Sequence, residues 1–181
     1  MDILANLFLS FDIIILMKNK IKKYLKEISI FFILIFIMSN AISLYRSTDL
    51  NKIPLELSKV SLIENKHYII DKTKPIMIHF WATWCPICKT EASNIQTISK
   101  NFQVISIATQ SGNDDKIKKY QKENGVDFMV INDIDGSLSK KFNISVFPTT
   151  IIYDKNQKVT FSDVGYSTTW SLWLKMIWAG L

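Results

Sequence analysis

Both cysteines of the chain stand at the point where a short apolar strand gives way to a helix. Residues 75–81, PIMIHFW, form a brief apolar run that starts at a proline, which predicts a buried strand. From Pro86 to Lys100, apolar residues recur near a 3.6-residue period and Pro86 suits the first turn, so this segment predicts a helix. Cys85 and Cys88 therefore lie at the mouth of that helix, and any fold must build a strand-to-helix corner around them.

The chain beyond residue 67 alternates between strand and helix patterns. We predict strands at residues 68–70, 104–108, 127–132, 149–153 and 158–163, the last two joined by a turn. We predict helices at residues 114–124, 136–142 and 168–179, the first capped by Asn113 and stopped by Gly125. This order favours an α/β fold with a mostly parallel sheet, helices on both faces and an antiparallel hairpin at one edge.

One face of the last predicted helix is strongly apolar. Its residues recur at helical spacing and are Trp170, Trp173, Leu174, Ile177 and Trp178. We interpret this face as an ordinary core stripe that needs no cofactor to explain it.

The balance of residue types excludes several classes of protein. Hydrophobic residues make up 48% and charged residues 21% of the 181 residues, so the chain can form a core and is too apolar to be disordered throughout. The net charge is +6, and the first 46 residues, with six basic and three acidic side chains, hold half of that excess. Because the positive charge is concentrated in this short part, it indicates a membrane as partner and not a nucleic acid.

An uncharged apolar stretch lies at residues 28–44, ISIFFILIFIMSNAISL. As a helix it would cover roughly 26 Å, the short end of what spans a bilayer. Lysines at positions 18, 20, 22, 23 and 26 precede it, so the positive-inside rule keeps residues 1–27 in the cytoplasm. We therefore predict a transmembrane signal anchor at 28–44, a linker at 45–61 and an outer domain at 62–181 that faces the periplasm or the exterior of a bacterial cell.

Two alternatives stay open for this N-terminal part. Ser39-Asn40-Ala41 has the small-residue spacing of a signal peptidase site, so cleavage after Ala41 competes with a retained anchor. The length of the apolar run favours the anchor. Met17, followed by lysines, is typical of the start of a signal anchor. Our hypothesis is that translation begins at Met17 and that residues 1–16 result from a start codon assigned too far upstream.

The sequence Cys85-Pro86-Ile87-Cys88 is suited to thiol–disulfide exchange. A helix N-terminus offers backbone N–H groups and the positive end of the helix dipole, and both stabilise a thiolate at Cys85. One turn later, Cys88 can reach the sulfur of Cys85 while the turn shields it from solvent. Cys85 would then attack a substrate disulfide and Cys88 would resolve the mixed disulfide. Pro86 stiffens the turn between them.

Other uses of a cysteine pair fit the sequence less well. A zinc site needs two further ligands, for which only His67 and His79 are at hand. Attachment of a c-type haem needs a histidine at position 89, which is a lysine. An inert structural disulfide would not need a strand-to-helix corner bordered by Trp81 and Trp84. We therefore expect no metal and no organic cofactor, with the cysteine pair itself as the redox group.

The segment HFWATWCPICKTE at residues 79–91 resembles the active-site motif of the thioredoxin superfamily. More narrowly, it is similar to the membrane-anchored, extracytoplasmic thiol–disulfide oxidoreductases of the TlpA type, especially the branch that contains the suppressor for copper sensitivity protein D. The resemblance covers residues 62–181. It implies a thioredoxin-like fold with a central mixed sheet, protein thiols and disulfides as substrates, and a membrane redox partner.

The resemblance also implies roles for residues beside the cysteine pair. Pro148 occupies the place of the family's cis-proline, which presents the backbone of Phe147 to an extended substrate chain. Trp84 is expected to border the substrate groove, and Pro86 and Ile87 support the pair from between the cysteines. Phe147 is bulkier than the residue often found at its place, so the substrate class stays open.

His79 and Glu91 are the two candidate proton carriers. His79 stands where thioredoxins proper have a buried aspartate that, by resemblance, helps to deprotonate the resolving thiol. A neutral imidazole would do the same work, or His79 is structural. Glu91 matches an acid of this branch that assists proton transfer or favours the helix N-terminus. Alternation along the strand puts His79 on the face of Met77 and Trp81, opposite Ile76, Ile78 and Phe80.

The sequence thus predicts a membrane-anchored thiol–disulfide oxidoreductase that works outside the cytoplasm. One alternative within this class is a reductase of apocytochrome c thiols during cytochrome c maturation. A second alternative, from another class, is a copper- or thiol-binding chaperone that uses the reduced pair as soft ligands for Cu(I). Whether the pair oxidises or reduces its substrates stays open.

Overall fold

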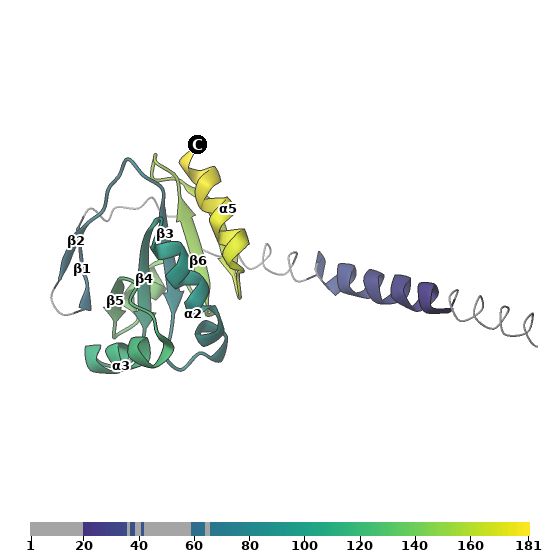
Figure 1. The fold of residues 1–181 in the computed structure, drawn as a ribbon. Helices are drawn as coiled ribbons and strands as arrows, with labels where there is room; N and C mark the ends of the chain where they lie inside the picture. The colour runs from purple at the N-terminus through teal and green to yellow at the C-terminus, as the bar shows by residue number, and fades with distance from the viewer. Residues whose placement is uncertain (1–19, 36, 39–40, 42–58, 64–65) are drawn as a thin grey trace, which may run out of the picture. The chain divides into compact units, whose positions relative to one another are not determined.

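The computed structural model describes residues 20–35, 37–38, 41, 59–63 and 66–181 (Figure 1). The chain divides into two compact units, Met1–Ile42 and Ser43–Leu181. The predicted start at Met17, most of the predicted linker and residues 39–40 of the predicted cleavage motif lie outside the described residues.

The described part of the first unit is helical at residues 20–35, 37–38 and 41. Its large apolar side chains are exposed, among them Phe31, Phe32 and Ile35. No helix of the described residues combines the length and the hydropathy needed to cross a membrane. Residues 36, 39–40 and 42–44 of the predicted anchor lie outside the described residues.

A five-stranded mixed sheet forms the centre of the second unit, with strand order β5-β4-β3-β6-β7. In the middle, β3 (Ile76–Trp81) pairs in parallel with β4 (Gln103–Thr109), which pairs in parallel with β5 (Val130–Asp133). On the other side, β3 pairs antiparallel with β6 (Thr149–Tyr153), and β6 pairs antiparallel with β7 (Val159–Val164). The predicted hairpin at the sheet edge is confirmed. The expectation of a mostly parallel sheet is wrong, because β6 runs antiparallel to β3 as well as to β7; the mixed sheet is the one that the family resemblance implies.

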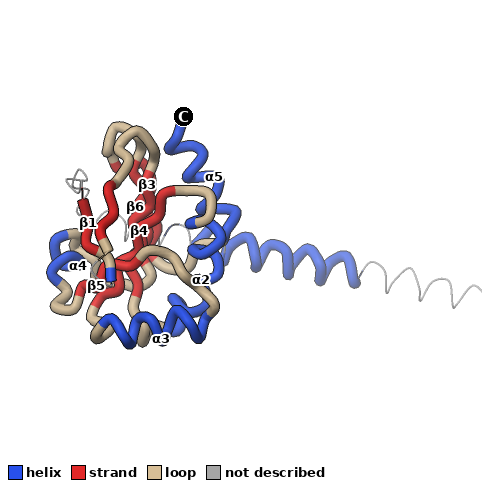
Figure 2. The backbone as a smooth tube through the Cα atoms, turned by 60° about the vertical axis from the view of Figure 1, so that its left-hand side comes forward, coloured by secondary structure: helices blue, strands red, loops and turns tan. Residues whose placement is uncertain are grey.

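Helices cover both faces of this sheet, as predicted. Three of them pack on the face of Met77 and Trp81, and the fourth packs on the face of Ile78 and Phe80. Figure 2 shows the strands between α4 and β1 on one side and α2 and α5 on the other. In chain order the helices are α2 (Pro86–Ser99), α3 (Asp114–Asn124), α4 (Ser137–Lys141) and α5 (Thr169–Gly180).

A small hairpin on the second face was not predicted as such. β1 (Lys59–Ser61) pairs antiparallel with β2 (His67–Ile69), and β1 lies in the stretch predicted as linker. The hairpin is fixed to β4 because Tyr68 Oη and the Asp71 N–H both donate to Gln103 Oε1, at 3.1 and 2.8 Å. The folded part of the second unit therefore begins no later than β1.

The apolar face of α5 that we interpreted as a core stripe is exposed, so that interpretation is wrong. The residues of α5 that are buried are Leu172, Met176 and Ala179, which join the same core cluster as α2. Trp170 is 74% exposed and Trp178 is 68% exposed. The exposed residues and the buried residues of α5 both recur at helical spacing, so the period alone could not show which side of the helix is buried. The side that packs against the domain is the one with the smaller side chains.

Candidate active site

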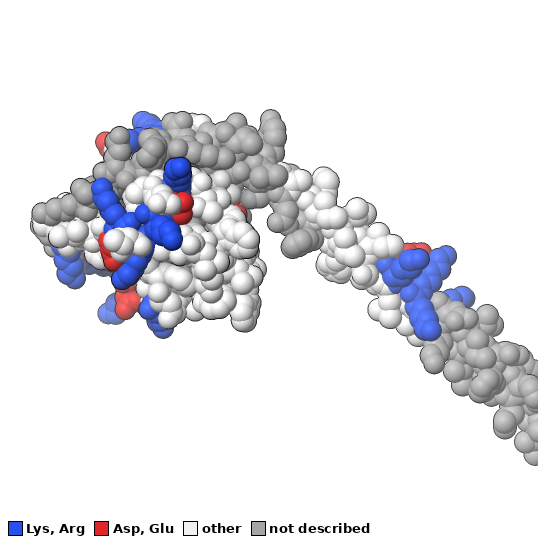
Figure 3. Space-filling view, turned by 90° about the horizontal axis from the view of Figure 1, so that it is seen from above, with Lys and Arg blue, Asp and Glu red and all other residues white. Residues whose placement is uncertain are grey.

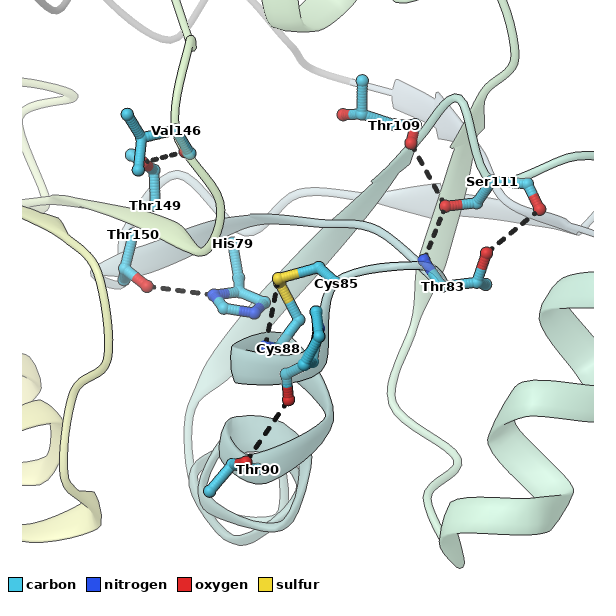
Figure 4. Close-up of a disulfide and its surroundings, with 11 residues drawn as sticks. His79, Thr83, Cys85, Cys88, Thr90, Thr109, Ser111, Val146, Thr149 and Thr150 are labelled. Carbon is cyan, nitrogen blue, oxygen red and sulfur yellow. Dashed lines mark hydrogen bonds between the residues drawn. A yellow bond between two sulfur atoms is a disulfide. The ribbon is translucent and has the colours of Figure 1, made fainter.

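The loop between β3 and α2 is held by the neighbouring loop that follows β4 (Figure 4). The Thr83 N–H donates to Ser111 Oγ at 3.0 Å, and Ser111 Oγ donates to the Thr109 carbonyl at 3.2 Å. The Trp84 indole N–H donates to the Gln110 carbonyl at 3.2 Å. These bonds fix the corner that carries the cysteines.

Cys85 and Cys88 form a disulfide at the N-terminus of α2, with 5.3 Å between their Cα atoms. Cys85 is the N-cap residue, and its Sγ accepts the Cys88 N–H at 3.2 Å. Cys85 is 6% exposed and Cys88 is 2% exposed, so the first cysteine is the nearer to solvent. In the reduced protein a thiolate at Cys85 would lie against the same N–H group and the positive end of α2, both of which stabilise its charge.

Apolar side chains border the disulfide. Trp84 and Ile87 are exposed, and Pro86 between the cysteines is exposed as well. The rings of Trp84 and Phe147 meet edge to face with their centroids 5.7 Å apart, and Phe147 packs against the core cluster that contains both cysteines. The Phe147–Pro148 peptide bond is cis, as the family resemblance implies. The segment before β6 therefore stands beside the cysteine pair.

His79 is buried in β3, on the sheet face that also meets the cysteines. Its neighbours on that face, Met77 and Trp81, belong to the core cluster of Cys85 and Cys88, which confirms the predicted alternation. Nδ1 of His79 lies 3.0 Å from Thr150 Oγ1 on β6 (Figure 4). Burial lowers the pKa of His79 to about 3, because the charged imidazolium is disfavoured away from water. The imidazole is therefore neutral at pH 7.

Glu91 is fully buried on α2, three residues after Cys88 and on the same side of the helix. Its Oε1 accepts the Ser167 N–H at 2.9 Å, while Oε2 has no hydrogen-bond partner among the described residues. Burial raises the pKa of Glu91 to about 8; the Ser167 N–H opposes this shift and the charge of Asp163 adds to it. Glu91 is therefore mostly protonated at pH 7, which does not fit the alternative that its charge favours the helix N-terminus.

Three residues near Glu91 were not predicted from the sequence. Asp163 of β7 binds the Lys175 ammonium through both carboxylate oxygens, at 2.7 Å for Oδ1, and the Ser167 hydroxyl donates to Asp163 Oδ2 at 3.4 Å. Ser167 lies 76 residues from Glu91 in the chain, so no local pattern joins them. The one available signal is that Lys175 is the only charged side chain of α5, whose residues are all described.

Metal ligands do not gather around this site. Within the part of the chain that the structure describes, no three His, Cys, Asp or Glu side chains lie close enough together to hold a metal ion. His67 is exposed in the β1–β2 hairpin, where its Nδ1 lies 3.3 Å from Ser61 Oγ.

A mixed sheet, a C-x-x-C disulfide at the N-terminus of the helix after its central strand and a cis-proline beside that disulfide together define a protein of the thioredoxin superfamily. Comparison with protein families agrees with this class. The Redoxin family matches residues 51–171, and the chain belongs to this family.

Proteins with similar sequences carry thioredoxin-like or thiol-disulfide oxidoreductase names. The chain is 28% identical over 166 residues to a thioredoxin-like protein of Haemophilus influenzae, a match that covers 88% of this chain and 97% of that protein. It is 32% identical over 92 residues to the thiol-disulfide oxidoreductase ResA of Bacillus subtilis, covering 49% of this chain and 51% of ResA. The relatives and the family together identify the chain as an oxidoreductase, a TlpA-like member of the thioredoxin superfamily.

Solved structures share the fold. StoA from Bacillus subtilis superposes with a TM-score of 0.59 at 22% identity, over 69% of this chain and 98% of StoA. A secreted disulfide oxidoreductase of Mycobacterium tuberculosis superposes with a TM-score of 0.58 at 19% identity, over 66% of this chain and 93% of that protein.

Proposed function

We propose that this chain exchanges protein dithiols and disulfides outside the cytoplasm of a bacterium, through Cys85 and Cys88. The observation that carries the proposal is the disulfide at the N-terminus of α2, whose first sulfur accepts a backbone N–H at 3.2 Å. Membership of the Redoxin family and the similarity to ResA support the same chemistry. The cysteine pair itself carries two electrons, so the reaction needs no metal or organic cofactor.

In the reducing direction the Cys85 thiolate attacks one sulfur of a substrate disulfide. A bond forms between Cys85 and the substrate, and the second substrate sulfur leaves as a thiolate that takes up a proton. Cys88 then loses its proton and attacks Cys85 Sγ, which closes the Cys85–Cys88 disulfide and releases the first substrate sulfur. The substrate gains two electrons and two protons, and the reverse sequence oxidises a substrate dithiol.

The two buried groups, Glu91 and His79, differ in how well they can accept the proton of Cys88. The pKa of Glu91 is raised to about 8, close to the value of about 8.5 for an ordinary thiol, so the ionised Glu91 carboxylate is comparable in base strength to an ordinary thiolate. The pKa of His79 is lowered to about 3, which makes its imidazole a far weaker base for a thiol. We therefore assign proton transfer with Cys88 to Glu91, and a structural role to His79 through its contact with Thr150.

The apolar border of the disulfide fits a protein substrate. Trp84, Ile87 and Phe147 offer an apolar surface around the sulfur atoms, suited to the side chains of an extended peptide. The backbone of Phe147, before the cis peptide bond to Pro148, would pair with that peptide as a strand edge does. A small charged substrate would gain little from these contacts.

We place the chain in the bacterial cytoplasmic membrane, with residues 28–44 as the anchor and the second unit outside. The support is the sequence itself, an uncharged apolar run behind a cluster of lysines. Reduced protein thiols arise outside the cytoplasm only if electrons cross the membrane, so a reductive role would require a membrane redox partner.

A redox titration tests the proposed activity and decides its direction. The full chain is equilibrated in glutathione buffers of increasing ratio of thiol to disulfide, and the state of Cys85 and Cys88 is read by alkylation and mass spectrometry, with Cys85→Ser as control. We expect one reversible two-electron transition. A midpoint well below that of glutathione indicates a reductase, including one for apocytochrome c, and a higher midpoint indicates an oxidant. A pair that does not exchange at all, but binds Cu(I) tightly when reduced, would contradict the proposal in favour of a copper chaperone.

A further inference from the structure

The C-terminal helix α5 carries an apolar face that no described part of the chain covers. We call it the tryptophan face. Its members recur at intervals of three and four residues, so they form one continuous stripe along the helix. Trp173 and Ile177 are each 38% exposed, and the other four are more than half exposed. The tryptophan face consists of Trp170, Trp173, Leu174, Ile177, Trp178 and Leu181.

The composition of the tryptophan face is that of a helix side that lies in a lipid–water interface. It contains three indole rings and three aliphatic side chains, and none of these six side chains is charged. Indoles favour the level of the lipid headgroups because they combine an apolar ring with one N–H donor. An exposed apolar patch of this kind on a folded domain marks a contact surface.

Two lysine side chains, Lys155 and Lys175, lie at the border of the tryptophan face and are not part of it. The Lys175 ammonium, on the flank of α5, is bound by Asp163. The Lys155 ammonium donates to a terminal main-chain oxygen of Leu181, at the C-terminal end of the face, at 3.1 Å. An ammonium has three donors, so Lys155 can also meet an anionic headgroup.

With the membrane attachment of the proposed function, a bilayer lies within reach of α5. The described part of the N-terminal helix has exposed apolar side chains, and its lysines gather at one end (Figure 3). Residues 42–58 separate it from β1, and even fully extended they span at most about 60 Å. A domain tethered this closely meets the membrane at a high effective concentration, so a weak interfacial contact suffices.

We propose that the tryptophan face of α5 lies in the lipid–water interface of the membrane to which the chain is attached. This inference rests on the membrane attachment in the proposed function. Docking would also orient the disulfide, because α5 is fixed to the helix that carries the cysteines. Asn94 of α2 accepts a hydrogen bond from Thr169 at 2.9 Å and donates to the Ser167 carbonyl at 2.9 Å.

Fluorescence quenching by brominated lipids tests the proposal on the full chain. The protein is reconstituted in liposomes of phosphatidylethanolamine and phosphatidylglycerol that contain a phosphatidylcholine brominated near the headgroup. Three of the five tryptophans belong to the tryptophan face, so we expect about half of the emission to be quenched. The variant in which Trp170, Trp173 and Trp178 are all Phe keeps the face apolar and retains Trp81 and Trp84; its emission should be unaffected.

Two charged variants separate docking from attachment. Ile177→Glu places a carboxylate on the tryptophan face and should abolish the quenching while the protein still floats with the liposomes. Thr97→Glu, at an exposed position of α2, is the matched control and should leave the quenching unchanged. If the wild-type chain floats with the liposomes but its tryptophans are not quenched, the docking is overturned and the attachment stands. The same holds if sedimentation of the wild-type chain shows a dimer in which a second copy covers the tryptophan face. A chain that does not float would overturn the attachment, and the docking with it.

Discussion

His79 and Glu91 are both buried, but their pKa values are shifted in opposite directions. We therefore expect the two side chains to have different roles in the second step of exchange. Glu91→Gln keeps an acceptor for the Ser167 N–H but cannot carry a proton. We expect it to slow the resolution of the mixed disulfide by about 10²–10⁴-fold, the usual range for general acid–base groups, and to leave the first attack by Cys85 nearly unchanged. Stopped-flow kinetics of the two steps measures this.

His79→Asn is the matched variant for that experiment. It keeps a polar group of similar size beside Thr150 and removes the imidazole. Because the pKa of His79 is lowered to about 3, its loss should change resolution far less than Glu91→Gln does. If His79→Asn slowed resolution as strongly and Glu91→Gln did not, the two roles would have to be exchanged.

The same pKa of Glu91 predicts how stability depends on pH. The pKa is 4.5 in the unfolded chain and about 8 in the folded protein, so between these values the folded state holds a proton that the unfolded state has lost. The free energy of unfolding must then fall as pH rises, by up to about 1.4 kcal/mol per pH unit. Urea unfolding of the oxidised protein at pH 6.5 and pH 8 should show the fall. His79 opposes it in the lower part of this range, because the unfolded His79 side chain, with a pKa of 6.5, still loses its proton there.

In Glu91→Gln this fall should be absent. The measured difference between the wild-type and variant slopes therefore isolates one carboxyl group from all the others. Equal slopes in the two proteins would mean that Glu91 is ionised in the folded state at neutral pH, and its role as proton carrier for Cys88 would fail with that result.

At the scale of elements, β7 and α5 supply the pair of charged side chains near Glu91. Burial is the main cause of the raised pKa of Glu91, the charge of Asp163 on β7 raises that pKa further, and Lys175 of α5 binds Asp163. In Asp163→Asn the like charge is gone, so the pKa of Glu91 should fall, and the pH at which resolution reaches half its maximal rate should fall with it. Asp127→Asn, at an exposed position, is the control and should leave the profile in place. A profile unmoved by Asp163→Asn would contradict the coupling.

Element boundaries could be predicted where local chemistry fixes them. α3 has the predicted ends, because Asn113 accepts the Lys116 N–H at 3.1 Å and Gly125 adopts a φ of 63° that stops the helix. β5 begins at Val130, three residues later than predicted. Asp127 and Phe128 instead form hydrogen bonds with side chains of the neighbouring helices: the Asp127 N–H donates to Gln96 Oε1 at 2.8 Å, and the Phe128 carbonyl accepts the Gln121 side-chain amide at 2.8 Å.

Contacts between distant elements could not be predicted in this way. The buried side of α5 depends on which of two apolar sets fits the space against the sheet and α2, and Leu172 and Met176 fit where the larger Trp170 and Trp178 do not. The partners of Glu91 come from β7 and the loop before α5, far along the chain. No periodicity or short motif contains that information.

At the scale of the whole molecule, the residue patterns were enough to predict the antiparallel hairpin at the sheet edge, the strand-to-helix corner and the cysteine pair within it, while the mixed sheet came from the family resemblance. The reason is that the corner is local: β3, the loop and α2 are consecutive in the chain. The cis peptide bond at Pro148 came from the family resemblance, because its position beside the disulfide depends on the sheet that joins β3 to β6.

The central claim is that Cys85 attacks protein disulfides and Cys88 resolves the product. The most direct test is to mix the Cys88→Ser chain with a protein disulfide substrate and to map the products by non-reducing electrophoresis and mass spectrometry. We expect a stable mixed disulfide on Cys85, since the resolving thiol is gone, and only a transient one in the wild-type chain. No adduct with Cys88→Ser, together with a stable adduct at Cys88 in Cys85→Ser, would contradict the account.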